Sequence, residues 1–138
     1  MRKLIILLLG MLLSSQTLPS SNPELDCLTK TVYHEARGEP HRGKLAVAVT
    51  ILNRVAHPRY PKTICKVVYQ RGQFSWVGKK QLRVNQKEWE EAINIALTVL
   101  DNPLILGEFK AISFHSLKVK PQWKLKRVAK IGNHIFYK

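Results

Sequence analysis

The chain has 138 residues, and its 23 lysine and arginine residues outnumber 9 aspartate and glutamate residues, giving a formal net charge of +14. That length suits one domain and excludes a large multidomain architecture. The positive charge favours polyanionic surroundings such as a cell wall, membrane phosphates or nucleic acid, without choosing among them. From residue 109 onward the chain has eight lysine or arginine residues and no acid.

The first 21 residues have the pattern of an export signal. Arg2 and Lys3 precede an apolar run over residues 4–13, and small polar residues follow it. A run of about ten residues is half of what a membrane-spanning helix needs, so a signal peptide is the favoured interpretation and an uncleaved anchor the alternative. We therefore expect residues 22–138 to form one domain in the periplasm, cell wall or extracellular space. Membrane contact would occur only through an uncleaved N-terminal segment.

Two cysteines, Cys27 and Cys65, lie in this domain. In an oxidising compartment they could form a disulfide that closes a loop of about 38 residues and stabilises the fold by roughly 3–4 kcal/mol. Two separate buried thiols fit the sequence equally well.

Hydrophobic periodicity predicts an α+β domain that is mostly helical and has a small β element. Asn22 and Pro23 have the residue types of a helix start, and apolar residues at helical spacing continue to residue 36. Gly38 and Pro40 are typical of the end of such a helix. A helix over 43–56 is apolar on nearly every face, which predicts a central, buried position.

Shorter elements follow. We expect a short helix over 63–69, then a loop or a small irregular sheet over 70–84. Weak alternation at 111–115 and 134–137 indicates the β element. A helix over 86–100 is expected to direct these side chains inward: Trp89, Ile93, Ala96, Leu97 and Leu100.

Carboxylic acids are scarce, so candidates for general acid–base chemistry are few. Seven of the nine are explained as helix N-terminal charges, solvated helix positions or turn residues, which leaves Glu35 and Glu39. Glu35 falls in the last turn of the first helix, where burial and the helix dipole both raise a carboxyl pKa. The alternative is a plain ion pair of Glu35 with Arg37 or Arg54.

No metal or cofactor is expected. His34-Glu35 lacks the second histidine of a His-Glu-x-x-His zinc helix, and the chain has no Cys-x-x-Cys pair and no Gly-x-Ser-x-Gly motif. The cluster Gln73-Phe74-Ser75-Trp76 offers aromatic faces for sugar C–H groups and polar groups for sugar hydroxyls. The same aromatic side chains could instead fill the core beneath a loop.

Taken in order, these motifs resemble the catalytic domain of SleB-type cell-wall hydrolases, the spore cortex-lytic family. The resemblance rests on Tyr33-His34-Glu35-Ala36-Arg37-Gly38-Glu39-Pro40, Ile51-Leu52-Asn53-Arg54-Val55, Tyr60-Pro61, Gln73-Phe74-Ser75-Trp76 and Lys130-Ile131-Gly132-Asn133-His134-Ile135-Phe136. It implies a lysozyme-like (lytic transglycosylase-like) fold over residues 22–138, peptidoglycan strands as substrate, and Glu35 as the catalytic glutamate. A specific nucleic-acid partner is disfavoured by the export signal.

On this hypothesis Arg37 and Arg54 position or neutralise neighbouring groups, and Asn53 orients them. Glu39 is the one nearby second acid. The side chains expected to line the glycan groove are Tyr33, Gln73, Phe74, Ser75 and Trp76. A single glutamate suits a lytic transglycosylase, which cleaves the MurNAc–GlcNAc bond and forms 1,6-anhydromuramyl products. The alternatives are a hydrolytic muramidase, an amidase of the same substrate, or a non-catalytic cationic wall-binding protein.

Overall fold

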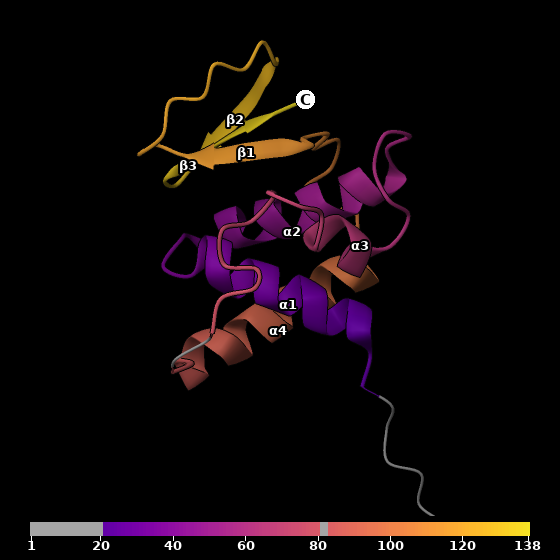
Figure 1. Ribbon diagram of the computed structural model, residues 1–138, viewed down its shortest axis with the longest axis vertical. Coiled ribbons are helices and arrows are strands. Elements are labelled where there is room, and N and C mark those ends of the chain that lie inside the picture. Colours follow the sequence, from indigo (N-terminus) through magenta and orange to yellow (C-terminus); the bar gives the residue numbers. More distant parts are fainter. Residues whose placement is uncertain (1–20, 81–82) are drawn as a thin grey trace, which may run out of the picture.

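The computed structural model describes residues 21–80 and 83–138, so the predicted signal peptide lies outside the described residues but for its last residue. None of the helices in these two ranges combines the length and apolar character that crossing a membrane requires. In chain order the elements are α1 (Pro23–Ala36), α2 (His41–Ala56), α3 (Ile64–Val68), α4 (Gln86–Asp101), β1 (Ser113–Ser116), β2 (Arg127–Ile131) and β3 (His134–Tyr137). The helices form one layer, and the sheet lies on the side of α2 (Figure 1). The predicted α+β, mostly helical class is confirmed.

Helix α1 begins and ends as its sequence predicts. The Asn22 side chain accepts hydrogen bonds from the backbone N–H groups of Glu24 and Leu25, and Pro23 occupies the first helical turn. The chain leaves the helix after Ala36, and Gly38 adopts a φ of 80° that an L side chain rarely tolerates. Because α1 contacts all three other helices, its last turn lies close to the centre of the domain.

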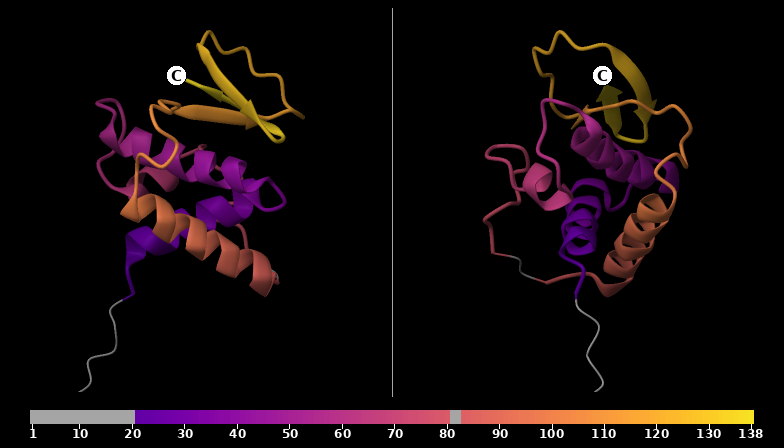
Figure 2. Two further views of the ribbon diagram at one scale, coloured as in Figure 1. Left: turned by 180° about the vertical axis from the view of Figure 1, so that it is seen from behind. Right: turned by 90° about the vertical axis from the view of Figure 1, so that its right-hand side faces the viewer.

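Helix α2 is the buried helix that its apolar sequence predicts, although it begins at His41, two residues earlier than expected. It lies between the other helices and the sheet, as both views of Figure 2 show. Residues 43–51 are buried without interruption. The Lys44 ammonium, itself nearly buried, forms an ion pair with Glu91 of α4 at 2.7 Å. An all-round apolar helix thus connects the helical layer to the sheet.

The prediction for α4 was wrong at Leu97, whereas Ala96 is buried and Trp89 and Leu100 pack partly buried against the core as expected. Leu97 was expected to point inward, but it is 47% exposed. The face that meets α1 and α2 repeats at the helical spacing i, i+3, i+4, i+7 and consists of Ala92, Ile95, Ala96 and Val99. Before α4, residues 70–80 and 83–85 contain turns and no strand, so the loop interpretation of this region holds for its described part.

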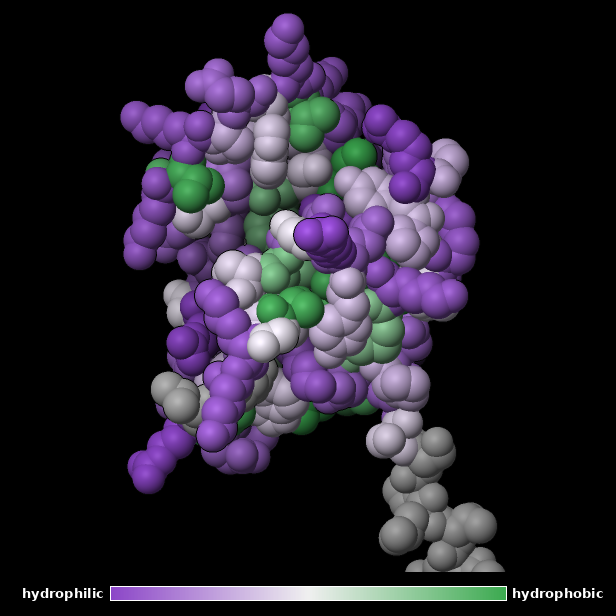
Figure 3. All heavy atoms as spheres, viewed as in Figure 1, coloured by the Kyte–Doolittle hydropathy of each residue, from purple (hydrophilic) through white to green (hydrophobic). Residues whose placement is uncertain are grey.

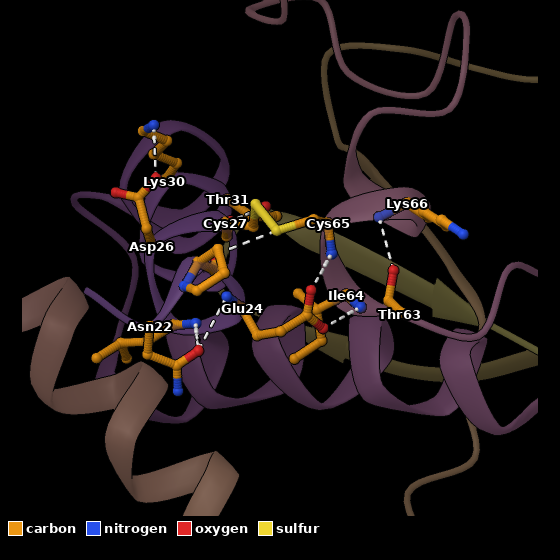
Figure 4. The surroundings of a disulfide bond; sticks show 12 residues. Asn22, Glu24, Asp26, Cys27, Lys30, Thr31, Thr63, Ile64, Cys65 and Lys66 are labelled. Carbon is orange, nitrogen blue, oxygen red and sulfur yellow. Dashed lines mark hydrogen bonds and ion pairs between the residues drawn. A yellow bond between two sulfur atoms is a disulfide. The ribbon is translucent and has the colours of Figure 1, made fainter. Parts of the chain in front are cut away.

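A disulfide joins Cys27 of α1 to Cys65 of α3, with their Cα atoms 5.3 Å apart (Figure 4). It closes a loop of 38 residues, which is worth roughly 3–4 kcal/mol of unfolded-state entropy. Beside it, the Glu24 carboxylate accepts hydrogen bonds from the backbone N–H groups of Ile64 (2.6 Å) and Cys65 (3.2 Å). Since a helix as short as α3 is marginal alone, these two links position it and the loop that follows.

The three strands form an antiparallel sheet in the order β1-β3-β2. Strands β2 and β3 are joined by a two-residue turn, Gly132 and Asn133, in which Gly132 has a φ of 55°. Phe136 in the central strand is fully buried and packs against Phe109 and Phe114 at ring separations of 5.3 and 5.7 Å. The sheet therefore turns an apolar face toward the helices and brings β1 and His134 close to α2.

Candidate functional site

A groove of about 740 Å³ runs between the helical layer and the sheet. One wall comes from the helical side, with Glu35 at the end of α1, Arg54 of α2, Tyr60, and residues 72–75 of the loop after α3. The other wall comes from β1 (residues 113–116), from His134, and from residues 119, 123 and 125 between β1 and β2. Segments far apart in the sequence therefore meet at this groove.

Glu35 lies in the last turn of α1 and is half-buried in the groove wall. Trp76 donates a hydrogen bond from its indole Nε1 to Glu35 Oε1 over 3.0 Å. Burial raises the pKa of the Glu35 carboxyl, while the Trp76 hydrogen bond and the Arg54 charge lower it to a smaller extent, so the pKa lies above its ordinary value. A carboxyl of this kind can hold a proton at a higher pH than a solvated glutamate and deliver it to a bound molecule.

Arg54 is 5% exposed and is held in place on every side. Its Nε donates to the backbone carbonyl of Ile112 at 2.6 Å, and a terminal nitrogen donates to Gln73 Oε1 at 3.1 Å. Its guanidinium also lies near the rings of Tyr60 and Phe74, 5.4 and 5.8 Å from their centroids. Arg54 therefore joins the two walls of the groove and supplies a fixed positive charge close to Glu35.

The alternative of a plain ion pair for Glu35 does not fit this geometry. Within the described part of the chain, the ion pairs shorter than or equal to 4.0 Å join Asp26 to Lys30, Lys44 to Glu91 and Glu39 to His134. Glu35 is in none of them. Its carboxylate instead accepts a hydrogen bond from the neutral Trp76 indole.

Trp76 was expected to line the groove, but it is not among the lining residues, and its indole instead contacts the Glu35 carboxylate. Its ring stacks on His34 at a centroid distance of 4.6 Å and on Phe74 at 5.9 Å. Phe74 is 8% exposed and also lines the groove. Its ring therefore fills the core beneath the loop, as one interpretation predicted, and also contributes to the groove wall, as the other predicted. Gln73 and Ser75 are exposed and line the groove as predicted.

Tyr33 and Arg37 lie away from the groove, contrary to the sequence-based expectation for Tyr33. Tyr33 is 2% exposed, and its hydroxyl accepts hydrogen bonds from Arg37 and from the backbone N–H of Asn85, both at 3.0 Å. Residues two positions apart on a helix point to nearly opposite sides, whereas residues four apart share a face. Because Glu35 faces the groove, Tyr33 and Arg37 face the start of α4 and tie it to α1.

Glu39 lies between α1 and α2, binds the turn between β2 and β3 through its carboxylate, and does not line the groove. Its carboxylate accepts hydrogen bonds from the backbone N–H (2.9 Å) and the side-chain amide (3.2 Å) of Asn133, and lies 4.0 Å from His134 Nδ1. A Cβ on Gly132 would collide with Glu39 Oε2. Glu39 thus positions the turn that carries His134 into the groove wall.

Asn53 also has a positioning contact. Its side-chain amide donates to the carbonyl of Phe109 at 2.7 Å and to that of Ala111 at 2.9 Å. Arg54 donates a hydrogen bond to the carbonyl of the following residue, Ile112. The Asn53-Arg54 pair of α2 therefore fixes the segment that leads into β1, and with it the sheet wall of the groove.

Sequence reasoning missed most of the sheet wall. His134 is 5% exposed, and burial lowers its imidazole pKa, against a smaller raising effect of the Glu39 carboxylate. His115 and Trp123 line the same wall. The available signal was the unusual Trp123 within a lysine-rich stretch. For a metal, no group of three His, Cys, Asp or Glu side chains in residues 21–80 and 83–138 is arranged to hold an ion.

Comparison with solved structures defines the class of domain. The chain is similar to the catalytic domain of the germination-specific lytic transglycosylase SleB from Bacillus anthracis, with a TM-score of 0.71 and 30% identity over 87% of this chain and 98% of that one. It is also similar to the catalytic domain of the Bacillus cereus SleB protein, with a TM-score of 0.69 and 29% identity over 83% and 89% of the two chains. The predicted lysozyme-like fold is confirmed.

The family model for cell wall hydrolases matches residues 38–137, and the chain belongs to this family. Curated relatives include the spore cortex-lytic enzymes of Bacillus subtilis, 32% identical over 118 residues, and Bacillus cereus, 32% identical over 122 residues. These alignments cover 84% and 86% of this chain but 38% and 45% of the relatives, so the chain spans less than half of their length. The resemblance to SleB-type hydrolases that the motifs indicate is confirmed.

Proposed function

We propose that this protein is a peptidoglycan-degrading enzyme that cleaves the MurNAc–GlcNAc glycosidic bond as a lytic transglycosylase, with Glu35 as its single acid and base. The observation that carries the proposal is the state of Glu35, a half-buried carboxyl in the groove wall with a raised pKa. Membership of the cell wall hydrolase family and the likeness to a lytic transglycosylase support it.

In the first step the protonated Glu35 carboxyl donates its proton to the glycosidic oxygen, and the bond from that oxygen to C1 of MurNAc breaks. The acetamido carbonyl oxygen of the same sugar stabilises C1. Burial favours this step because it keeps the carboxyl protonated to a higher pH than in water. The Trp76 hydrogen bond orients the carboxyl and then stabilises the carboxylate that remains.

In the second step the Glu35 carboxylate removes the proton from the C6 hydroxyl of MurNAc. The C6 oxygen bonds to C1, which closes the 1,6-anhydro ring and returns the proton to Glu35. Hydrolysis ordinarily uses a second carboxylate as nucleophile or as base for water. Of the described residues that line the groove, Glu35 is the one acid, and Glu39 is bound to Asn133, which favours the single-glutamate route.

The remaining expectations are consistent with this proposal. Peptidoglycan lies outside the cytoplasmic membrane, so the enzyme would act there after export by residues 1–21. The mature chain's excess of lysine and arginine would attract it to the acidic groups of the wall. No metal or cofactor takes part in the two steps.

Mass spectrometry of the soluble products tests the proposal. The purified protein is incubated with peptidoglycan from vegetative walls and from spore cortex, and muropeptides are analysed. We expect 1,6-anhydromuramyl ends, which lack one water relative to reducing MurNAc ends. Reducing ends would show a hydrolytic muramidase, and free peptides on intact glycan would show an amidase. Wall binding without any product would favour the non-catalytic cationic protein.

A further inference from the structure

The connection between β1 and β2, residues 117–126, has a composition that the rest of the chain lacks. Its sequence, Leu-Lys-Val-Lys-Pro-Gln-Trp-Lys-Leu-Lys, alternates apolar and lysine residues at both ends. We call it the arm. Eight large hydrophobic side chains are exposed in the described part of the molecule, and four of them lie in this arm: Leu117, Val119, Trp123 and Leu125. Single exposed apolar residues are ordinary, whereas a cluster of four in ten residues indicates a contact surface.

The arm faces the groove with its apolar side. Val119, Trp123 and Leu125 line the same groove as Glu35. In the sequence of the arm, lysines at 118, 120, 124 and 126 alternate with the apolar residues. At the sheet end of the molecule, small hydrophobic groups lie among long hydrophilic side chains (Figure 3). The arm itself arches over the sheet at that end (Figure 2).

Trp123 is held in a cluster of three rings. Its indole contacts the edges or faces of His115 and Tyr137 at centroid distances of 5.4 and 5.6 Å. His115 stacks on Tyr137 at 5.3 Å, and the two share a hydrogen bond of 2.8 Å between Nε2 and the hydroxyl. Both rings lie on paired strands, so the 45% exposed Trp123 is braced by the sheet. A rigid aromatic surface loses little conformational entropy when a ligand covers it.

We propose that Trp123 is a sugar-stacking platform at the arm side of the groove, and that it binds one N-acetylated pyranose ring of the glycan. The apolar face of such a ring presents C–H groups that suit the indole surface. Val119 and Leu125 extend the contact, and Tyr137 acts as a positioning residue through its ring contact with Trp123 and its hydrogen bond to His115. The choice of a glycan as ligand rests on the proposed function.

Neutral N-acetylglucosamine oligosaccharides are the probe, because they separate ring stacking from attraction between the lysines and acidic wall groups. Binding is measured by isothermal titration calorimetry with the full-length Glu35→Gln protein, which removes turnover. Adding Trp123→Ala should weaken binding roughly tenfold, and Trp123→Phe by less, because part of the aromatic surface remains. Leu104→Ala, at a 75% exposed apolar residue outside the groove, is the matched control and should leave the Kd unchanged.

The role of Tyr137 is tested in the same assay. Tyr137→Phe keeps the ring and removes the hydrogen bond to His115, so we expect a small loss of affinity, about two- to threefold. Tyr137→Leu removes the stacked ring and should approach the loss seen for Trp123→Ala. Thermal unfolding of each variant checks that the fold is retained. Rescue of affinity by phenylalanine but not by leucine is the signature of ring positioning.

A folded Trp123→Ala protein with the affinity of its parent would overturn the platform, and so would a parent that fails to bind the oligosaccharides. The outcome is separable from that of the proposed function. Trp123-dependent binding by a wild-type protein that cleaves no glycan would sustain the platform and reject the catalytic proposal. Cleavage of glycan by a protein whose binding does not depend on Trp123 would sustain the catalytic proposal and reject the platform.

Discussion

The indole nitrogen of Trp76 donates a hydrogen bond to Oε1 of Glu35 over 3.0 Å, joining the loop after α3 to the last turn of α1. This bond favours the ionised carboxylate, whereas burial of Glu35 favours the protonated acid and has the larger effect. A group that donates a proton and then takes one back works best when its pKa lies near the pH of the reaction. The opposing effects of burial and the Trp76 bond therefore determine how far the Glu35 pKa lies above its ordinary value.

Replacing Trp76 by Phe tests this balance. The variant keeps an aromatic ring beside His34 and loses the donor to Glu35. Because the hydrogen bond lowers the Glu35 pKa, its loss should raise that pKa further and move the alkaline limb of the activity profile to higher pH. The maximal rate should fall about tenfold, since the carboxyl is less well oriented. A pH–rate profile on peptidoglycan checks both effects, and an unmoved alkaline limb would reject the role given to Trp76.

The raised pKa of Glu35 also predicts a pH-dependent stability. The native state binds the Glu35 proton more tightly than the unfolded chain, so this group lowers stability as pH rises from its ordinary range through the raised value. Gln cannot ionise and can still accept the Trp76 bond. Glu35→Gln should therefore unfold at a higher temperature than wild type near pH ~8, and the difference should vanish below pH ~4. Thermal melts across this range measure it, and an equal difference at both ends would contradict the account.

Arg54 is expected to be costly to replace. Arg54→Met removes the donors to the Ile112 carbonyl and to Gln73, and leaves the part-buried carbonyl without that partner. We expect a loss of about 2–4 kcal/mol in the free energy of unfolding, measured by urea denaturation. Arg37→Met is the matched control, because Arg37 is exposed, and should cost less than ~1 kcal/mol. Equal losses for the two variants would show that Arg54 does not join the groove walls as described.

Gly132 combines a positive φ with close contact to Glu39. Gly132→Ala adds a Cβ that meets both Glu39 and the Cδ of Pro40, the latter at 2.8 Å. Gly107 has a φ of 64° with no atom within 4 Å of an added Cβ, so Gly107→Ala reports the backbone cost alone. We expect Gly107→Ala to cost about 1 kcal/mol and Gly132→Ala distinctly more, roughly 2–3 kcal/mol. Equal costs would remove the evidence that Glu39 packs into this turn.

Local signals predicted the helices and the position of Glu35. The Asn22-Pro23 start and the Gly38 end depend on neighbouring residues, so they can be recognised in the sequence. Tyr33 was misplaced because it was expected to share a function with Glu35 of the same motif, although residues two positions apart on a helix point to nearly opposite sides. The face of α4 was misjudged at Leu97 because the choice of buried face depends on α1 and α2, which sequence periodicity alone does not locate.

The sheet wall could not be predicted for a different reason. His134 and Trp123 line the groove because strand pairing and a few long-range hydrogen bonds position the sheet. These hydrogen bonds involve Asn53, Arg54 and Glu39, and each joins residues more than fifty positions apart in the sequence. Such contacts leave no periodic pattern. Asn53 and Glu39 stood out in the sequence as parts of a motif, Asn53 as a residue that orients its neighbours and Glu39 as a second acid, and the contacts of both are those of residues that position the groove.

The central claim is that Glu35 alone supplies the acid and the base, and one comparison tests it most directly. Release of soluble glycan from purified peptidoglycan is measured for wild type, Glu35→Gln and Glu39→Gln, each with its unfolding temperature. We predict that Glu35→Gln loses activity by roughly 10²–10⁴-fold while it stays folded. Glu39→Gln should keep activity within a few-fold, because a Gln side chain can still accept a hydrogen bond from Asn133. A Glu35→Gln protein that still releases glycan, or a folded Glu39→Gln protein that is equally inactive, would contradict the account.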